Sequence, residues 1–503
     1  MFLRLGSGGH ARCLRQSHGT VNGSLSSVPT NRREYNKRTN TLMDASGSKE
    51  RKSPQEIVRD VLELCADCDT CRTLMEEDCV FFPELYRLWD REKEAGVPIA
   101  EEDLRNVVDL CTLCGLCPCP RVPADLMEAK SRYIELEGLP LAIRLLTDVP
   151  RMARLCGAFP HLVNTLQSSK TIGPLLRRLT RTHPERKIPP FPERSFFDWA
   201  VQKGLTSKKE GSHNVAYFAG CTAGYLFPQV GQAVVEVLEH NGVTVYVPPQ
   251  DCCGMPHLVE GDRTTALERI QSNMNNLLES VQTGNDLVTS CPSCGYFMKI
   301  LLKERACYSE AFQKSVNAGE DEIKIPRTGR GGTKHRILKK SMYKDILKDD
   351  GYFSSLDPLG RIGLSEQLSD AGEYLAHLHA EGRFVTNFAA ISERMVYFAP
   401  CHQREQKIGS PYLDLISLIP GISIERLHGM YCCGMGGNFG YKAGFHEKSL
   451  GVGRPLMEKI RELSPQAIIT DCMSCRLQFN HVLPYPVFHP MEILARAYPT
   501  GEV

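Results

Sequence analysis

Ten cysteines form one pattern that the chain carries twice. Each copy has a single cysteine, an adjacent pair followed by glycine, and a Cys-x-x-Cys motif. In both copies 30 residues separate the single cysteine from the pair, and 37 or 38 separate the pair from the motif, which indicates an internal repeat. The two sets are Cys221, Cys252, Cys253, Cys291 and Cys294, and then Cys401, Cys432, Cys433, Cys472 and Cys475. Five thiolates exceed the four ligands of a tetrahedral zinc ion, so each set favours an iron–sulfur cluster.

Eight further cysteines lie upstream in two Cys-x-x-Cys-x-x-Cys runs, each with a trailing cysteine. They are Cys65, Cys68, Cys71 and the trailing Cys79, and then Cys111, Cys114, Cys117 and the trailing Cys119. This pattern is typical of a ferredoxin with two four-iron clusters, in which the trailing cysteine of one run ligates the other cluster. Cys119 would then complete the first set and Cys79 the second. The tails, of seven residues and one residue, depart from the usual spacing, so the opposite pairing and a three-iron cluster both stay open.

The sequence around the repeated cysteines predicts the elements that position them. Each copy alternates short β-type runs with helical stretches, which predicts a small α/β unit with a parallel sheet. The first copy has these at 215–220, 230–240, 243–247 and 287–289, and the second at 395–400, 411–418, 422–424 and 468–470. The cysteines follow the carboxyl ends of the strands, where α/β folds place their sites. The upstream runs lie instead in helical sequence at 57–64 and 104–110, which predicts an α-helical ferredoxin.

The composition is that of a globular protein. The 503 residues are 42% hydrophobic and 24% charged with a formal net charge of +1, which suggests two to four domains and gives no reason to invoke nucleic acid. Twenty-one cysteines grouped in these motifs indicate metal binding in a reducing compartment, not a disulfide scaffold. Cys13, Cys156 and Cys307 match no motif and are predicted to be free thiols. No apolar run reaches the length of a membrane-spanning helix.

On these eighteen cysteines, the chain resembles the CCG-domain iron–sulfur subunit family, which is related to heterodisulfide reductase. Its layout is similar to that of the iron–sulfur subunits of anaerobic glycerol-3-phosphate dehydrogenase and of glycolate oxidase. The resemblance covers about residues 55–495. It implies an α-helical ferredoxin domain followed by two repeated α/β CCG domains with parallel sheets. It also implies two cubane [4Fe-4S] clusters in the ferredoxin and one noncubane [4Fe-4S] cluster in each CCG domain.

Six segments follow from this interpretation. They are an N-terminal segment 1–50, a ferredoxin over 51–138, a basic amphipathic helical linker over 139–213, a first CCG domain over 214–308, an inserted loop region over 309–368 and a second CCG domain over 369–503. The first 42 residues carry seven Lys or Arg and one acidic residue, so the N-terminal segment is either a transit peptide, a disordered tail or sequence upstream of a start at Met43. The insertion centres on the glycine-containing basic stretch 327–332 and is interpreted as a loop or partner contact.

The linker combines basic and apolar residues at helical spacing. Its stretch 139–187 holds nine Lys or Arg, including Arg177, Arg178 and Arg181, against Asp148 and Glu185. Basic amphipathic helices can lie on an anionic membrane surface. The alternative is a set of helices that pack on the CCG domains and keep a solvated basic face.

Two functions stay open. In the first, the chain is an electron-transfer subunit that relays electrons from a flavoprotein dehydrogenase to a quinone or other acceptor, in the cytoplasm or on the inner face of the cytoplasmic membrane. In the second, the CCG clusters themselves cleave a disulfide, as the resemblance to heterodisulfide reductase implies. A zinc-binding scaffold is a third interpretation, which the five-thiolate sets disfavour. His402, next to Cys401, is the candidate catalytic residue, as a donor to cluster sulfur or to substrate, with a structural role as the alternative.

Overall fold

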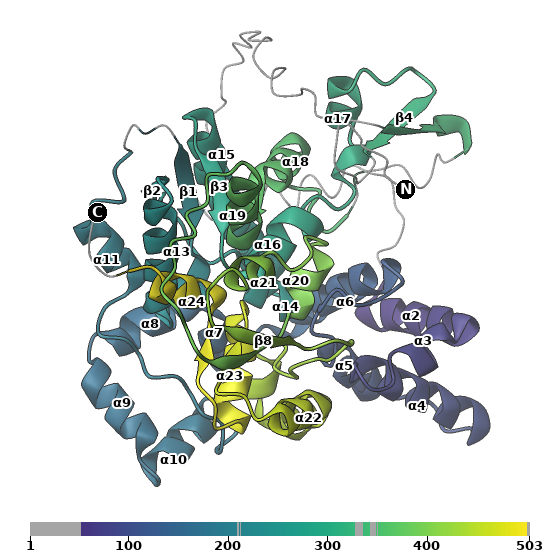
Figure 1. Cartoon of the computed structure of the whole chain (residues 1–503). Helices are drawn as coiled ribbons and strands as arrows, with labels where there is room; N and C mark the ends of the chain where they lie inside the picture. Colours follow the sequence, from purple (N-terminus) through teal and green to yellow (C-terminus); the bar gives the residue numbers. More distant parts are fainter. Residues whose placement is uncertain are drawn as a thin grey trace, which may run out of the picture. The chain divides into compact units, whose positions relative to one another are not determined.

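The computed structural model describes residues 52–208, 211, 213–326, 335–342, 349 and 351–499. Lys52–Val503 forms one compact unit, whose helices and strands are labelled in Figure 1. The predicted N-terminal segment 1–50, with Cys13, and the basic stretch 327–332 lie outside the described residues. Among the residues that are described, no helix combines the length and the apolar character needed to cross a membrane.

The segment predicted as a ferredoxin is helical, as the sequence indicated. It consists of α2 (Pro54–Cys68), α3 (Thr70–Leu74), α4 (Phe81–Glu94), α5 (Glu101–Asp109) and α6 (Arg121–Glu137). Helix α2 begins where Ser53 and Glu56 cap each other: the Ser53 side chain accepts from the Glu56 amide, and the Glu56 carboxylate accepts from the Ser53 amide. Its apolar stripe, which includes Val58 and Val61, is buried in the helical core.

The first repeat contains a parallel sheet of four strands in the order β2-β1-β3-β6. Its strands are β1 (Asn214–Phe218), β2 (Thr244–Tyr246), β3 (Asp286–Thr289) and β6 (Leu368–Asp370), and its helices include α12 (Gly220–Tyr225), α13 (Pro228–His240), α14 (Met255–Val259), α15 (Arg263–Gln282) and α16 (Pro292–Gly295). Strand β6 spans residue 369, where the sequence analysis placed the start of the second CCG domain, and it extends the first sheet instead. Three of its residues, Leu368, Ser369 and Asp370, are in register with β3.

The second repeat has the same topology. Its parallel sheet has the order β8-β7-β9-β10, with β7 in the place of β1. Its elements are β7 (Arg394–Tyr397), α20 (Cys401–Glu405), α21 (Pro411–Ile416), β8 (Ser423–Arg426), α22 (His446–Leu463), β9 (Ala467–Ile469), α23 (Met473–Val482), β10 (Val487–Phe488) and α24 (Pro490–Ala497). The two parallel sheets and the repeated α/β units are therefore confirmed.

The last helix of each repeat packs against the other repeat. Helix α24 of the second repeat packs on α13 of the first, and α19 (Ala371–Ala380), which follows β6, packs on α21 of the second. Buried residues of all four helices belong to one apolar core. Beside it, the Asn241 side chain donates to the Tyr498 hydroxyl at 3.0 Å and accepts from the Val385 amide at 2.7 Å. Neither sheet can therefore bury its faces without the other repeat.

The linker is helical, as predicted, and holds α7 (Leu141–Thr147), α8 (Val149–Gly157), α9 (Pro160–Ser168), α10 (Ile172–Leu179) and α11 (Phe196–Gln202). The interval 309–368, predicted as a loop region, contains regular structure. It holds α17 (Glu310–Ser315), the antiparallel strands β4 (Glu322–Pro326) and β5 (His335–Lys339), and α18 (Pro358–Gln367). Branched residues such as Ile323 and Ile325 alternate with polar ones, which favours a hairpin over an irregular loop.

Candidate functional site

The five cysteines of the first repeat gather at the carboxyl end of its sheet. Cys221 follows β1 and lies in the first turn of α12, the pair Cys252 and Cys253 follows β2, and Cys291 and Cys294 follow β3. The sulfur atoms of Cys221 and Cys252 lie 3.5 Å apart, and both residues are buried. The pKa of the Cys294 thiol is raised well above its usual value, because of hydrogen bonds with the Cys253 and Cys291 thiols and then burial. The predicted set therefore comes together in one place.

The second repeat arranges its five cysteines in the same way. Cys401 begins α20 after β7, the pair Cys432 and Cys433 follows β8, and Cys472 and Cys475 follow β9. The sulfur atoms of Cys433 and Cys475 lie 3.2 Å apart in the buried interior. Strand, turn and helix thus recur with the thiols in matching places, as the spacing predicted.

A glycine after each pair lets a helix approach the cysteines closely. Gly254 has φ +102° and Gly434 has φ +83°, a backbone conformation that side chains disfavour. A Cβ atom at Gly254 would lie 2.9 Å from the Ala266 carbonyl oxygen in α15, and one at Gly434 would lie 2.0 Å from the Ser449 carbonyl oxygen in α22. The repeated Cys-Cys-Gly sequence is therefore required by packing as well as by ligand chemistry.

The upstream cysteines lie in α2 and α3 and in the connections that follow α3 and α5. Four of them line one cavity, together with Cys432 of the second repeat: Cys79, Cys111, Cys114 and Cys117. The remaining four form a separate group, in which burial and then the thiols of Cys71, Cys119 and Cys68 raise the pKa of Cys65 to about 12. The trailing cysteines thus lie beside the run that the ferredoxin rule assigned to them.

These thiol groups fit iron–sulfur clusters by their chemistry. None of the described cysteines forms a disulfide, and Cys156 and Cys307 are half-buried free thiols. Burial is the main cause that raises the pKa of Cys79 to about 12 and of Cys114 to about 11, so these groups ionise only when a cation compensates their charge. Clustered thiols of this kind fit iron–sulfur clusters, and the five-cysteine sets exceed the four ligands of a zinc ion.

A family model for the cysteine-rich CCG domain matches residues 215–299 and 395–480. The chain carries two CCG domains. Both matches run from the first strand of a repeat through its Cys-x-x-Cys motif, so they coincide with the two thiol sets just described.

Three relatives agree with this assignment. In Escherichia coli, one subunit of the anaerobic glycerol-3-phosphate dehydrogenase is 23% identical over 355 residues, 70% of this chain and 76% of the relative. In Methanothermobacter marburgensis, one subunit of the CoM/CoB fumarate reductase is 24% identical over 293 residues, 56% of this chain and 46% of the relative. An uncharacterized iron–sulfur protein of Methanocaldococcus jannaschii is 25% identical over 273 residues, 54% of this chain and 41% of the relative. The chain is thus similar to one subunit of a dehydrogenase, to one subunit of a reductase and to an iron–sulfur protein.

His402 joins three of the cysteine-bearing loops. Its Nδ1 lies 2.9 Å from the Ser293 hydroxyl, between Cys291 and Cys294 of the first CCG domain, and its Nε2 lies 3.1 Å from the Leu113 carbonyl oxygen, in the connection between α5 and α6. Burial lowers the pKa of His402 to about 4, so the ring is neutral near pH 7 and donates from Nε2 while accepting at Nδ1. Both nitrogens have partners within the protein. The catalytic role of His402 stays a prediction, and its contacts favour positioning of the loops.

The sequence analysis missed two arginines beside the CCG thiols. Arg186 was counted only among the basic residues of the linker, and Arg269 was not singled out. Arg186 is 1% exposed and lies against Met435, two residues after Cys433. Arg269 pairs with Asp148 at 3.0 Å near the first set. No local pattern marks either residue, because both reach the thiols from other elements.

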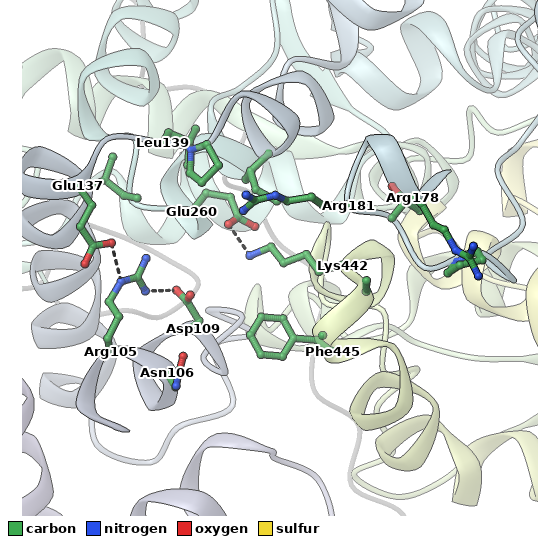
Figure 2. Close-up of a pocket in the computed structure, with 17 residues that line it drawn as sticks. Arg105, Asn106, Asp109, Glu137, Leu139, Arg178, Arg181, Glu260, Lys442 and Phe445 are labelled. Carbon is green, nitrogen blue, oxygen red and sulfur yellow. Dashed lines mark hydrogen bonds and ion pairs between the residues drawn. The ribbon is translucent and has the colours of Figure 1, made fainter. Parts of the chain in front are cut away.

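A cavity of about 610 Å³ opens between helices α5 and α6, the linker and the second CCG domain (Figure 2). Its walls include the apolar residues Leu139 and Phe445, and five of its charged residues form ion pairs. The pairs are Arg105 with Asp109 at 2.6 Å and with Glu137 at 3.0 Å, and Lys442 with Glu260 at 2.5 Å. Arg178 and Arg181 also line the cavity, and no ion pair is found for either within the described part of the chain.

Proposed function

We propose that this CCG protein is the iron–sulfur electron-transfer subunit of an oxidoreductase. It would take electrons from a flavoprotein dehydrogenase and deliver them to a quinone or another acceptor. The observation that carries the proposal is one cavity lined by Cys79, Cys111, Cys114 and Cys117 and also by Cys432, which supports electron transfer between a ferredoxin site and the second CCG site. The relationship to one subunit of a dehydrogenase supports a partner that supplies the flavin.

Eighteen cysteines would hold the clusters. Two cubane clusters would bind Cys65, Cys68, Cys71 and Cys119, and Cys79, Cys111, Cys114 and Cys117; two noncubane clusters would bind the five cysteines of each CCG domain. When bound, such clusters accept and release single electrons. The protein's own part is to exclude water from the thiols, to hold the loops through His402 and to set the local charge.

The linker has a surface that could dock on a membrane, where a lipid-soluble acceptor such as a quinone would lie. Eight of the large apolar side chains exposed in the described residues lie in its stretch 141–179: Leu141, Leu155, Phe159, Leu162, Ile172, Leu175, Leu176 and Leu179. Arg178 and Arg181 are exposed beside them and also line the 610 Å³ cavity. Apolar and cationic groups side by side suit the surface of an anionic bilayer. The thiol-rich sites favour the reducing, cytoplasmic side of such a membrane.

Metal content tests the proposal most directly. Protein purified without oxygen should contain about sixteen iron and about sixteen sulfide per chain, because four clusters each hold four of both. Cys433→Ser should remove the noncubane signal of the second CCG site and leave the signals of the first CCG site and of the ferredoxin, since the second CCG thiols form a set of their own. Stoichiometric zinc with little iron would refute the redox function.

Vesicle binding tests the membrane surface. Arg178→Glu with Arg181→Glu should release the protein from anionic vesicles, and binding by the unaltered protein should weaken with salt. Arg177 is unsuitable for this test, because its Nε donates to the Pro184 carbonyl at 2.6 Å and it therefore supports the fold. Lys314→Glu is a matched control, since this exposed lysine lies on α17 of the insertion. Unaltered protein that stays in the supernatant at low salt would reject membrane docking and leave electron transfer standing.

The complete thiol set in both CCG domains favours a second function, the reduction of a disulfide at these sites. A disulfide consumes two electrons and two protons and yields two thiols. Pre-reduced protein, mixed with a disulfide or with a water-soluble quinone analogue, should be reoxidised rapidly by only one of them. Rapid reoxidation by the disulfide alone would favour this alternative.

A further inference from the structure

The end of the linker is attached to the second CCG domain by backbone hydrogen bonds. Thr182 and Lys442 form an isolated antiparallel bridge. Beside it, the His183 amide donates to the Tyr441 carbonyl at 3.0 Å, and the Ala443 amide donates to the Arg181 carbonyl at 2.9 Å. This attachment fixes the path of the chain that follows and carries the Arg186 side chain into the domain.

Arg186 lies against the loop that bears the cysteine pair. Its Nη2 lies 2.6 Å from the Met435 sulfur and donates to the Gln478 side-chain oxygen. Gln478 approaches the Ser449 hydroxyl at 3.4 Å, and that hydroxyl donates to the Gly434 carbonyl at 2.7 Å. The guanidinium is therefore held beside the residues that directly follow Cys433.

The charge of Arg186 has no carboxylate to oppose it. The side chain is 1% exposed, its Nε and Nη1 have no hydrogen-bond partner, and no ion pair joins it to an acidic residue among those the structure describes. A buried, unpaired charge is strongly unfavourable unless an anion lies nearby. Cys433 lies next to this arginine, because Met435, whose sulfur Arg186 contacts, donates its amide to the Cys433 sulfur at 3.5 Å. The thiolates of the second set are thus the anions that this arginine faces.

The first CCG domain balances its cations differently. Arg269 lies beside the first thiol set but forms ion pairs with Asp148 at 3.0 Å and with Asp251 at 2.5 Å. His257, near Cys252, faces Asp262 at 3.3 Å. Arg269 at the first site therefore has carboxylates beside it, whereas no described carboxylate forms an ion pair with Arg186 at the second.

We propose that Arg186 is the counter-cation of the second CCG site and gives this site a higher reduction potential than the first. The inference rests on the proposed function, since it assumes a cluster at each site. An electron that arrives at the second site adds one negative charge, which Arg186 stabilises across a weakly screening interior. At the first site, Asp148 and Asp251 offset the charge of Arg269.

This asymmetry gives electron flow a direction. The second site is the one whose Cys432 lines the cavity of the ferredoxin cysteines. One electron lost from the ferredoxin side reduces the second site by one electron, and no proton or atom needs to move with it. Arg186 makes this transfer favourable and retains the electron beside the linker.

A metal ion bound beside Arg186 fits the geometry less well. Ligand atoms of His183, Glu185 and His446 lie within 4.8 Å of one another. However, the rings of His183 and His446 stack at 3.8 Å, and burial followed by the positive charges of His183 and Arg186 lowers the pKa of His446. The same positive charge that opposes a proton opposes a divalent cation. The surroundings of Arg186 therefore suit an anion.

Redox titration followed by electron paramagnetic resonance tests the inference. Cys433→Ser and Cys253→Ser first assign the signals of the second and first sites. In the unaltered protein, the second site should have the higher midpoint potential. Arg186→Gln should lower that potential and leave the first site unmoved, whereas Arg186→Lys should restore part of the shift.

Lys187→Gln is the matched control, because it removes the same charge from the adjacent, exposed residue, whose Nζ donates to the Asn480 carbonyl at 3.1 Å. It should shift neither potential appreciably, since water and salt screen an exposed charge.

Three results would overturn the inference. One is a lower potential at the second site in the unaltered protein, which needs no substitution at Arg186 and so does not depend on whether its variants fold. Another is an unmoved second-site potential in Arg186→Gln that retains all clusters, which would leave the electron-transfer proposal intact. The third is a protein that loads no noncubane cluster, which would overturn both proposals because Arg186 would then face no cluster.

Discussion

Replacing Gly434 by alanine should damage the second CCG site more than the same change at Gly437, three residues later. Both glycines have positive φ, +83° and +64°, so both substitutions carry the backbone strain of a left-handed residue. They differ in space. A Cβ atom at Gly437 meets nothing within 4 Å, whereas one at Gly434 would lie 2.0 Å from the Ser449 carbonyl oxygen and 3.0 Å from the Gly453 amide nitrogen.

The difference in magnitude follows from these distances. Left-handed strain costs about 1–2 kcal/mol at each position. At Gly434, the 2.0 Å approach to the Ser449 oxygen is far inside ordinary contact, so helix α22 must shift away from the cysteine pair. Overpacking of this kind adds about 1–3 kcal/mol. We therefore expect Gly434→Ala to lose about 2–5 kcal/mol and Gly437→Ala about 1–2 kcal/mol.

Anaerobic thermal denaturation, followed by the visible absorbance of the clusters and by iron content, measures the effect. Gly254→Ala should fall between the other two, because its Cβ atom would lie 2.9 Å from the Ala266 carbonyl oxygen. Gly434→Ala should also lose iron from the second CCG site, because the substituted residue directly follows Cys433 and α22 must move away from it. A Gly434→Ala protein as stable and as rich in iron as Gly437→Ala would refute the packing argument.

Three further predictions concern buried polar groups. Burial lowers the pKa of His489 to about 3 from an ordinary 6.5. The resulting stability is fully present above pH 6.5, and about 2 kcal/mol of it is lost as the pH falls to 5. In urea unfolding, the stability of His489→Asn should therefore depend less on acid pH than that of the unaltered protein, and an equal dependence would contradict this prediction. Lys130→Met should cost about 2–4 kcal/mol in urea unfolding, because the ammonium donates to the Cys111 and Val259 carbonyls at 2.6 and 2.8 Å; a neutral result would show that these bonds are dispensable. Asp349→Asn should cost about 3–5 kcal/mol, because it leaves the fully buried Arg361 without its carboxylate, and Arg361→Met with Asp349→Asn should recover part of that loss.

The repeat could be predicted from the sequence because its signals are local. Cysteine spacing fixes which residues share a strand end, and short β-branched runs before Cys221 and Cys401 predict the strands that carry them. The glycine after each pair is likewise a local backbone requirement. The sequence therefore predicted the grouping of the eighteen cysteines, the two α/β units and the helical segment upstream.

Other features depend on contacts between residues distant in sequence, which only the tertiary structure decided. Strand β6 and helix α19 lie where the sequence suggested a boundary, yet they complete the first sheet and pack on the second repeat, because each sheet leaves an apolar face that only its partner repeat can cover. His402 gains its two partners 109 and 289 residues away. In the sequence, Arg186 is one of nine Lys or Arg residues in the stretch 139–187. Its burial beside Met435 follows from the backbone bridge at Thr182, and that placement turns an ordinary charge into one that acts on the second site.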